Sequence, residues 1–429
     1  MKQVLLTALL GITALSGNAQ SVTDTVSVGT NAGGVSYPNN VWYSLPNDEQ
    51  GSVSKKNWDL AFQVYGGYTA SIMANNIGGT TVWLYPKDAA TTTSWAAVDT
   101  NGLSTWSKLY NSDITWGDGA LSRNVDVTNA NDLGWGLYDM NTHYVMGDSI
   151  YIVKTVSGTY KKLWIKSLIS SVYTFTFANL DGTAETTDTV GKATYAGQNF
   201  GYYSLDNSAA LSREPLTANW DIVFGQYYSS AYNPPYAVTG VLQNNGVKVA
   251  KAVIDPSTVG NYVDTNHTFA TSISTIGFDW KTFNGQTYDV NDSVVYFVKR
   301  MNNDIWKVVF TGFGGSTDGN FIFTKEKIFT APPAPTAVGN VNAPQTSLAL
   351  YPNPSRGQNV TLVYSFDKQV AGAKLNLFDL NGRVILSDNL QTSTGLYQYV
   401  LPTQSLSAGM YVISVEADGA RTQQKLIVQ

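Results

Sequence analysis

The sequence contains no cysteine and only two histidines, His143 and His267, among its 429 residues. The absence of cysteine excludes disulfides, thiolate metal sites and a cysteine nucleophile. With two histidines, sites with several imidazole ligands and Ser-His-Asp hydrolysis are nearly excluded as well. Charged residues form only 13% of the chain and the net charge is −5. Binding to nucleic acid needs clustered Lys and Arg against the phosphates, so we expect no nucleic-acid partner.

Aromatic residues and glycines are abundant instead, with 26 Tyr, 11 Trp and 38 Gly. Short runs such as 149–154 and 172–177 are rich in β-branched and aromatic residues and are bounded by Gly, Asn, Asp or Ser, which is typical of strands. Helical periodicity is weak, and residues 89–108 form the best candidate helix. We therefore predict an all-β fold, with two tandem homologous antiparallel β domains and a C-terminal Ig-like β-sandwich.

The N-terminus has the features of an export signal. Lys2 is followed by an apolar stretch at 4–15 and by the small residues Gly17 and Ala19, which together predict a signal peptide at 1–19. The apolar stretch is too short to span a membrane, and no later segment reaches about 18 uninterrupted apolar residues. We expect an exported protein without a transmembrane helix of its own.

Four short motifs occur twice and in the same order, which indicates a tandem duplication. Their separations of 164, 160, 162 and 144 residues are far above the 20–50 residues of solenoids and propellers. Each copy is long enough to have a core of its own. We expect the first repeat at 20–182 and the second at 183–330. The recurring pairs are Thr-Asp-Thr-Val at 23–26 and 187–190, Tyr-Ser-Leu at 43–45 and 203–205, Asn-Trp-Asp at 57–59 and 219–221, and Asp-Ser at 148–149 and 292–293.

Trp58 and Trp220 occupy equivalent positions in the two copies, each followed by an aspartate and then by apolar residues. We interpret them as buried structural anchors, with the carboxylate stabilising a turn. The same indole should then lie at the same place in each copy.

A proline-rich linker at 331–347 separates the repeats from a different unit at 348–429. Such linkers are extended and semi-rigid. The unit beyond it contains six alternating segments, and Asn381-Gly382 predicts a tight turn between the second and the third. A small antiparallel β-sandwich would bury their alternating apolar faces.

This C-terminal unit resembles the type A C-terminal sorting domain of the type IX secretion system of Bacteroidetes. The resemblance is carried by four ordered motifs. It implies passage across the outer membrane, with the secretion machinery as partner and a location that is secreted or attached to the outer cell surface. The motifs are Leu-Tyr-Pro-Asn-Pro at 350–354, Leu-Phe-Asp-Leu-Asn-Gly-Arg-Val at 377–384, Leu-Ser-Ala-Gly-Met-Tyr-Val at 406–412 and Lys-Leu-Ile-Val at 425–428.

The duplicated region resembles the HmuY family of bacterial haem carriers, once per copy. The motifs that carry this resemblance are Asn-Trp-Asp-Leu-Ala-Phe at 57–62, Tyr-Asp-Met-Asn-Thr-His at 138–143 and the strand pattern at 151–155. It implies a β-rich binding protein that captures haem or another planar ligand, with haem as the candidate cofactor.

Haem iron is held by imidazole or thioether donors, among others. The candidate haem-binding residues are His143, Met140 and Met146 of the first copy. Alignment from Asp148 and Asp292 places Thr287 opposite His143, so the copies share no histidine ligand. His267 is interpreted as a solvated histidine, and no metal is assigned.

No catalytic motif is present, and we expect a binding protein rather than an enzyme. A second hypothesis stays open, in which the protein is a surface structural or adhesive protein that keeps the scaffold without binding haem. Two linked copies suit multivalent display.

Overall fold

The computed structural model describes residues 21–30, 34–66, 69–86, 92–263, 267–331, 346–379, 382–418 and 420–429. The chain forms two compact units, which divide between Ala331 and Pro332. The expected signal peptide at 1–19 and most of the expected linker at 331–347 lie outside the described residues. Across these described ranges, no helix is long and apolar enough to cross a membrane.

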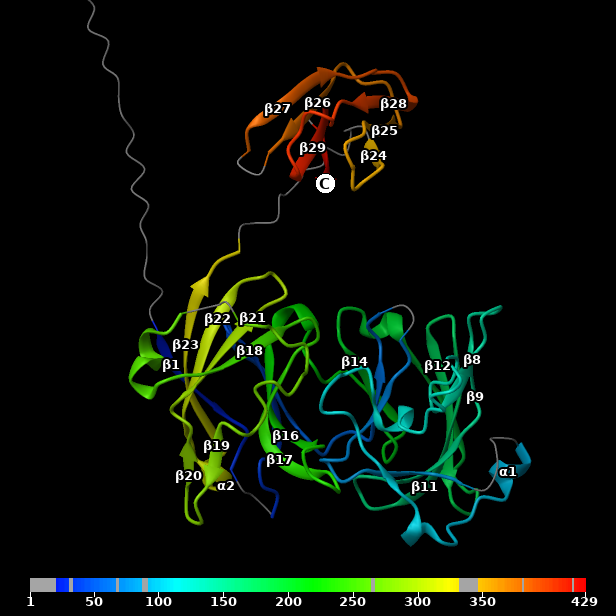
Figure 1. Ribbon diagram of the computed structural model, residues 1–429. Coiled ribbons are helices and arrows are strands. Elements are labelled where there is room, and N and C mark those ends of the chain that lie inside the picture. Colours follow the sequence, from blue (N-terminus) through cyan, green and yellow to red (C-terminus); the bar gives the residue numbers. More distant parts are fainter. Residues whose placement is uncertain are drawn as a thin grey trace, which may run out of the picture. The chain divides into compact units, whose positions relative to one another are not determined.

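The all-β prediction is confirmed, since strands dominate both units (Figure 1). In the first unit, two sheets and a hairpin surround a core that contains Tyr43, Phe224 and Phe323. We call it the terminal core, because it uses both ends of the unit. Its five-stranded sheet has the order β1 (Val22–Ser27), β23 (Asn320–Phe329), β22 (Ile305–Phe313), β21 (Val294–Lys299) and β18 (Lys248–Val253). Its four-stranded sheet has the order β17 (Tyr236–Gln243), β16 (Ile222–Ser229), β2 (Asn39–Ser44) and β3 (Asp48–Ser54). The hairpin pairs β19 (Lys281–Phe283) with β20 (Tyr288–Val290).

The middle of the same unit builds a second core, the central core, around Phe62, Phe175 and Tyr203. An eight-stranded and a four-stranded sheet enclose it. The larger sheet has the order β13 (Thr186–Gly191), β12 (Val172–Asn179), β11 (Tyr160–Ile169), β10 (Ile150–Lys154), β6 (Thr81–Leu84) and β7 (Lys108–Leu109). In the same sheet, β9 (Val145–Gly147) also pairs with β11, and β8 (Gly136–Tyr138) pairs with β9. The smaller sheet has the order β15 (Ala209–Leu211), β14 (Phe200–Ser204), β4 (Leu60–Gln63) and β5 (Ile72–Ala74).

Helical segments are short. The expected helix at 89–108 is largely wrong, because its described part contains only α1 (Thr92–Ala96) and the 3₁₀ turn η1 (Leu103–Thr105). Gly102 has φ +86° and starts that turn, a conformation that ends regular helix. The other short segments are α2 (Gly315–Asp318), η2 (Ala120–Ser122), η3 (Lys192–Tyr195), η4 (Thr217–Asn219) and η5 (Pro256–Asn261).

The two repeats exchange strands. Strand β2 of the first repeat pairs with β16 of the second, while β14 of the second pairs with β4 of the first. The register is the same in both pairs, since Tyr43 lies opposite Ile222 and Tyr203 lies opposite Leu60. These are equivalent positions of the duplication.

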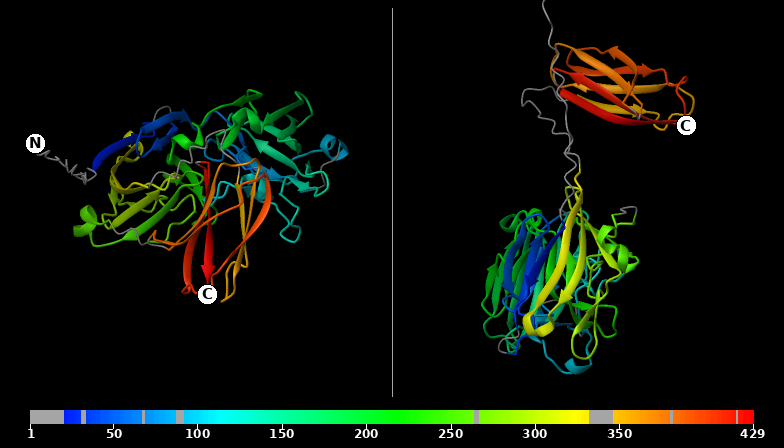
Figure 2. Two further views of the ribbon diagram at one scale, coloured as in Figure 1. Left: turned by 90° about the horizontal axis from the view of Figure 1, so that it is seen from above. Right: turned by 90° about the vertical axis from the view of Figure 1, so that its left-hand side faces the viewer.

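The first strand of each repeat follows the same rule. Strand β1 lies beside β23 (Figure 2). This pairing places Asp24 opposite Phe323, and the pairing of β13 with β12 places Asp188 opposite Phe175. Each core therefore contains strands of both repeats, which differs from the expectation of one core per copy. The exchange buries the same strand faces that separate domains would bury, so sequence pattern does not distinguish the two arrangements.

The strand registers also correct the alignment of the second half of each repeat. Tyr151 lies opposite Leu163 and donates its hydroxyl to a buried carbonyl, and Tyr296 does the same opposite Val308. These two tyrosines are equivalent, which moves the alignment by one residue from the Asp-Ser pairs. Counted this way, His143 corresponds to Tyr288 rather than to Thr287.

The second unit is an antiparallel β-sandwich whose two sheets face each other (Figure 2). Its core contains Leu362, Leu375 and Ile413. Leu380 and Asn381 of the predicted tight turn lie outside the described residues, and Gly382 has φ +79°, as a turn glycine does. The sheets have the orders β24 (Thr346–Tyr351), β25 (Val360–Phe366), β28 (Gly395–Leu401), and β27 (Val384–Asn389), β26 (Ala373–Phe378), β29 (Gly409–Ala417), β30 (Ala420–Val428).

Candidate functional site

The three candidate haem ligands lie on one hairpin of the first repeat. His143 and Met140 are in the turn between β8 and β9, and Met146 is in β9. The methionine side chains are 69% and 50% exposed for Met140 and Met146, respectively. The His143 Nδ1 atom is hydrogen-bonded to the Tyr138 hydroxyl at 2.6 Å. The structure thus gathers these residues on an exposed loop.

His267 differs from its interpretation as a solvated residue. Its ring is half-buried and stacks on Phe297 with a centroid distance of 5.6 Å and an interplanar angle of 12°. Its Nε2 atom is hydrogen-bonded to the Tyr262 hydroxyl at 3.0 Å. His267 therefore belongs to the packing of the second repeat.

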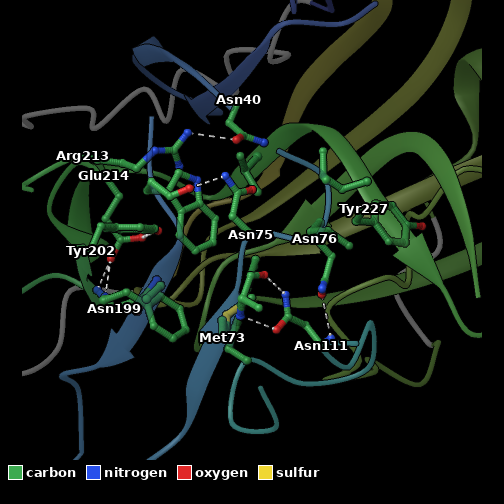
Figure 3. A pocket seen from close by; sticks show the side chains of 18 of the residues that line it. Asn40, Met73, Asn75, Asn76, Asn111, Asn199, Tyr202, Arg213, Glu214 and Tyr227 are labelled. Carbon is green, nitrogen blue, oxygen red and sulfur yellow. Dashed lines mark hydrogen bonds between the residues drawn. The ribbon is translucent and has the colours of Figure 1, made fainter. Parts of the chain in front are cut away.

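A pocket lies where the two repeats meet, and we call it the seam pocket. One aromatic cluster on its wall contains Trp58, Phe200 and Tyr202, and a second contains Trp42 and Trp220. Trp116 packs against both clusters. Figure 3 shows this pocket from close by. The space inside it that the centres of water molecules can occupy has a volume of about 120 Å³.

The strand exchange positions these clusters. In each repeat, the aspartate of the Asn-Trp-Asp motif donates its backbone N–H to the tyrosine carbonyl of the Tyr-Ser-Leu motif in the other repeat, at 2.8 Å. Its carboxylate accepts the leucine N–H of the same motif, also at 2.8 Å. The two tryptophans beside these aspartates are thereby fixed in the two aromatic clusters of the seam pocket. The partners are Asp59 with Tyr203 and Leu205, and Asp221 with Tyr43 and Leu45.

The indole nitrogens of these tryptophans are unpaired. Trp58 is 8% exposed and Trp220 1% exposed. The Nε1 atom of each is buried and has no hydrogen-bond partner in the part of the chain that the structure describes. A buried donor without an acceptor costs about 1–3 kcal/mol, so both N–H groups would gain from an acceptor nearby.

Arg213 lies in the wall among three rings. Its guanidinium carbon is 5.1 Å from the ring centroid of Trp42, 5.5 Å from that of Trp58 and 5.2 Å from that of Tyr202. Such cation–π contacts strengthen when the cation is desolvated. The guanidinium also donates to the side-chain oxygens of Asn57 and Asn40 and to the Ser54 carbonyl, at 3.0, 3.0 and 2.9 Å.

Glu214 follows Arg213 and is also buried (Figure 3). Its carboxylate accepts the backbone N–H groups of Asn199 and of Phe200, the latter at 2.7 Å, and the Tyr202 hydroxyl at 3.1 Å. Burial raises the pKa of Glu214 to about 7, because desolvation outweighs these hydrogen bonds. This carboxyl is the one titratable group of the wall whose pKa is brought near neutral pH.

Asp113 connects the loop that carries Trp116 to the end of β16. Its carboxylate accepts hydrogen bonds from the Ser229 hydroxyl at 3.2 Å and from the Ser230 N–H and hydroxyl at 3.1 and 2.7 Å. Trp116 itself donates its Nε1–H to the Gln243 carbonyl at 2.9 Å. The loop of the first repeat is thus held against strands of the second.

Sequence reasoning did not find Arg213 or Glu214. An adjacent Arg-Glu pair in a chain with so few charges was the available signal. Their role depends on contacts across the seam, which the repeat pattern does not show.

Comparison with known proteins identifies the C-terminal unit. Residues 349–429 match the family described as "Secretion system C-terminal sorting domain". This confirms the predicted type IX sorting domain, whose partner is the secretion machinery, and the protein is exported and is secreted or attached to the outer cell surface.

The comparisons add little on the repeats. No curated protein matches the chain. A solved structure of dimeric latent PorU from Porphyromonas gingivalis is similar at 12% identity and a TM-score of 0.17, over 90% of this chain and 40% of that chain. This chain thus spans less than half of that protein, and a similarity of this degree carries no argument about fold or function.

Proposed function

We propose that this exported protein is a non-enzymatic binding protein that holds a small ligand in the seam pocket. The observation that carries the proposal is a cavity with aromatic walls from both repeats. Ligand sites of soluble proteins are mostly apolar hollows with a few fixed polar groups, often where two domains meet. The sorting domain delivers this pocket to the outside of the cell, where a captured ligand is encountered.

The charged groups of the wall support binding rather than catalysis. Arg213, Glu214 and Asp113 are each held by several hydrogen bonds from the protein. A general acid or base must be placed to exchange a proton with the substrate. Groups tied in this way instead stiffen the pocket.

The size of the cavity sets the scale of the ligand. A water molecule needs about 10–15 Å³ of such volume, so 120 Å³ corresponds to roughly ten waters. A single six-membered ring with substituents fills this space. A porphyrin is several times larger and would enter only in part.

Haem capture on the β8–β9 hairpin is the second candidate function. Its support is the grouping of His143, Met140 and Met146 on one exposed loop, together with the resemblance to the HmuY family. The hydrogen bond between His143 Nδ1 and the Tyr138 hydroxyl leaves Nε2 free for iron in the tautomer in which Nδ1–H donates, as in metal-bound histidines with an outer partner.

Titration of the 21–331 fragment, which covers the first compact unit, separates these candidates. A seam-pocket ligand should change tryptophan fluorescence and lose affinity in Trp116→Ala. Trp106→Ala is the matched control, because Trp106 packs in a separate cluster with Tyr85. Haemin bound on the hairpin should give a Soret shift that His143→Ala removes and Trp116→Ala leaves unchanged. A surface adhesive without a ligand would give neither response.

A further inference from the structure

The charged side chains of the seam pocket already have hydrogen-bond partners within the protein. Arg213 is surrounded by three oxygen acceptors and three rings, and Glu214 and Asp113 accept hydrogen bonds from backbone and hydroxyl donors. A charged ligand would enter a partly desolvated site whose charged groups are already hydrogen-bonded to the protein, which is costly. The pocket therefore favours an uncharged ligand.

Two side-chain amides leave hydrogen-bond donors open in the wall. The side-chain oxygen of Asn40 accepts from Arg213 at 3.0 Å, and that of Gln226 accepts from Lys55. The NH₂ groups of these half-buried amides have no hydrogen-bond partner in the described ranges. The two unpaired indole N–H groups are buried behind the wall and do not add to these amide donors. Donors of this kind need a ligand rich in oxygen acceptors.

Trp116 supplies a fixed flat surface. It is half-buried, its Nε1–H is held by the Gln243 carbonyl, and it packs edge-on against Phe200 with a centroid distance of 6.0 Å. An indole held in this way can stack on the C–H face of a ring without losing side-chain freedom.

From these features we infer that the seam-pocket ligand is an uncharged pyranose, a neutral hexose or the terminal unit of a neutral glycan. This inference rests on the proposed function and specifies its ligand. A pyranose has hydroxyl and ether oxygens around its edge and C–H groups on its faces, no net charge, and the size of the cavity. A flat apolar molecule would leave the amide donors unpaired.

The test uses the 21–331 fragment with glucose, galactose and mannose, with glucuronic acid as the charged analogue and indole as the apolar ring. Binding is followed by calorimetry and tryptophan fluorescence. Gln226→Glu and Asn40→Asp keep the oxygens that accept from Lys55 and Arg213, and they replace each NH₂ donor by an acceptor. Each should weaken binding of the neutral sugar by about tenfold or more. Gln286→Glu adds the same charge on an exposed turn and should bind like the parent.

The outcomes are distinct. Binding of a neutral hexose that Gln226→Glu weakens and Gln286→Glu preserves supports the inference. If indole or glucuronic acid binds in a Trp116-dependent way and the neutral sugars do not, the sugar inference fails and the seam-pocket function stands. If no compound binds, both are contradicted. Melting curves show which variants are folded, and Gln226→Glu alone decides the test if Asn40→Asp unfolds.

Discussion

The two buried aspartates at the seam occupy equivalent places and are stabilised in different ways. Asp59 accepts from three neutral donors, the N–H groups of Leu205 and Val156 and the Thr80 hydroxyl. Asp221 accepts one backbone N–H and forms an ion pair with Arg300, whose Nε lies 2.8 and 2.9 Å from the two carboxylate oxygens. The duplication thus kept the strand exchange and changed the partners. The conserved element is the link between repeats rather than any one side-chain contact.

The largest effect should come from removing the tryptophans beside these aspartates. Trp220→Ala and Trp58→Ala each leave a large cavity and should lower the free energy of unfolding by about 3–5 kcal/mol. Trp220 is the more buried and should lie at the upper end. Chemical denaturation of the 21–331 fragment measures this. Equal stability of either variant and the parent would show that the seam clusters do not hold the repeats together.

Replacing each aspartate by asparagine distinguishes the ion pair of Asp221 from the neutral hydrogen bonds of Asp59. Asp221→Asn leaves Arg300 without its buried partner and should cost about 3–5 kcal/mol. Asp59→Asn loses only neutral hydrogen bonds and should cost about 1–3 kcal/mol. The same denaturation experiment gives both values, and a larger loss for Asp59→Asn would reverse the comparison.

Glu214 should give the seam a pH dependence. Its folded pKa of about 7 lies above the unfolded value of about 4.3. The folded state therefore binds the proton more tightly than the unfolded state does. The stability that proton binding adds is present below pH 4.3 and is lost as pH rises through 7. The loss is on the order of 3 kcal/mol. Glu214→Gln mimics the protonated carboxyl, so its melting temperature should fall less between pH 5 and 8 than that of the parent. Parallel curves would contradict this.

A smaller effect is expected where the two cores differ at their first strands. Lys325 donates to Tyr43 and Asp48 and lies 3.3 Å from Asp24. The equivalent position of the central core holds Phe177, beside the Tyr203–Asp188 hydrogen bond of 2.7 Å.

Lys325→Met should therefore cost about 1 kcal/mol, because partly exposed carboxylates lose one cation and remain solvated. The exposed Lys248→Met is its control. A loss as large as that of Asp221→Asn would show that this cluster, too, is a buried ion pair.

The sequence predicted what local pattern determines. The repeats, the all-β class and the sorting domain follow from turn residues, alternation and motif order. Strand exchange was not predictable, because Tyr43 and Tyr203 bury the same faces against either copy of the Trp-Asp strand. The seam pocket depends on that choice of partner, so Arg213 and Trp116 had no visible connection in the sequence.

The most direct test of the account is the assembly state of the separate repeats, 21–182 and 183–331. Each lacks the strands that the other contributes, so neither should fold as a monomer. We expect dimers formed by the same exchange, or unfolded chains, when mass and circular dichroism are measured together. Two folded monomers that each unfold cooperatively would contradict strand exchange, and with it a pocket built jointly by both repeats.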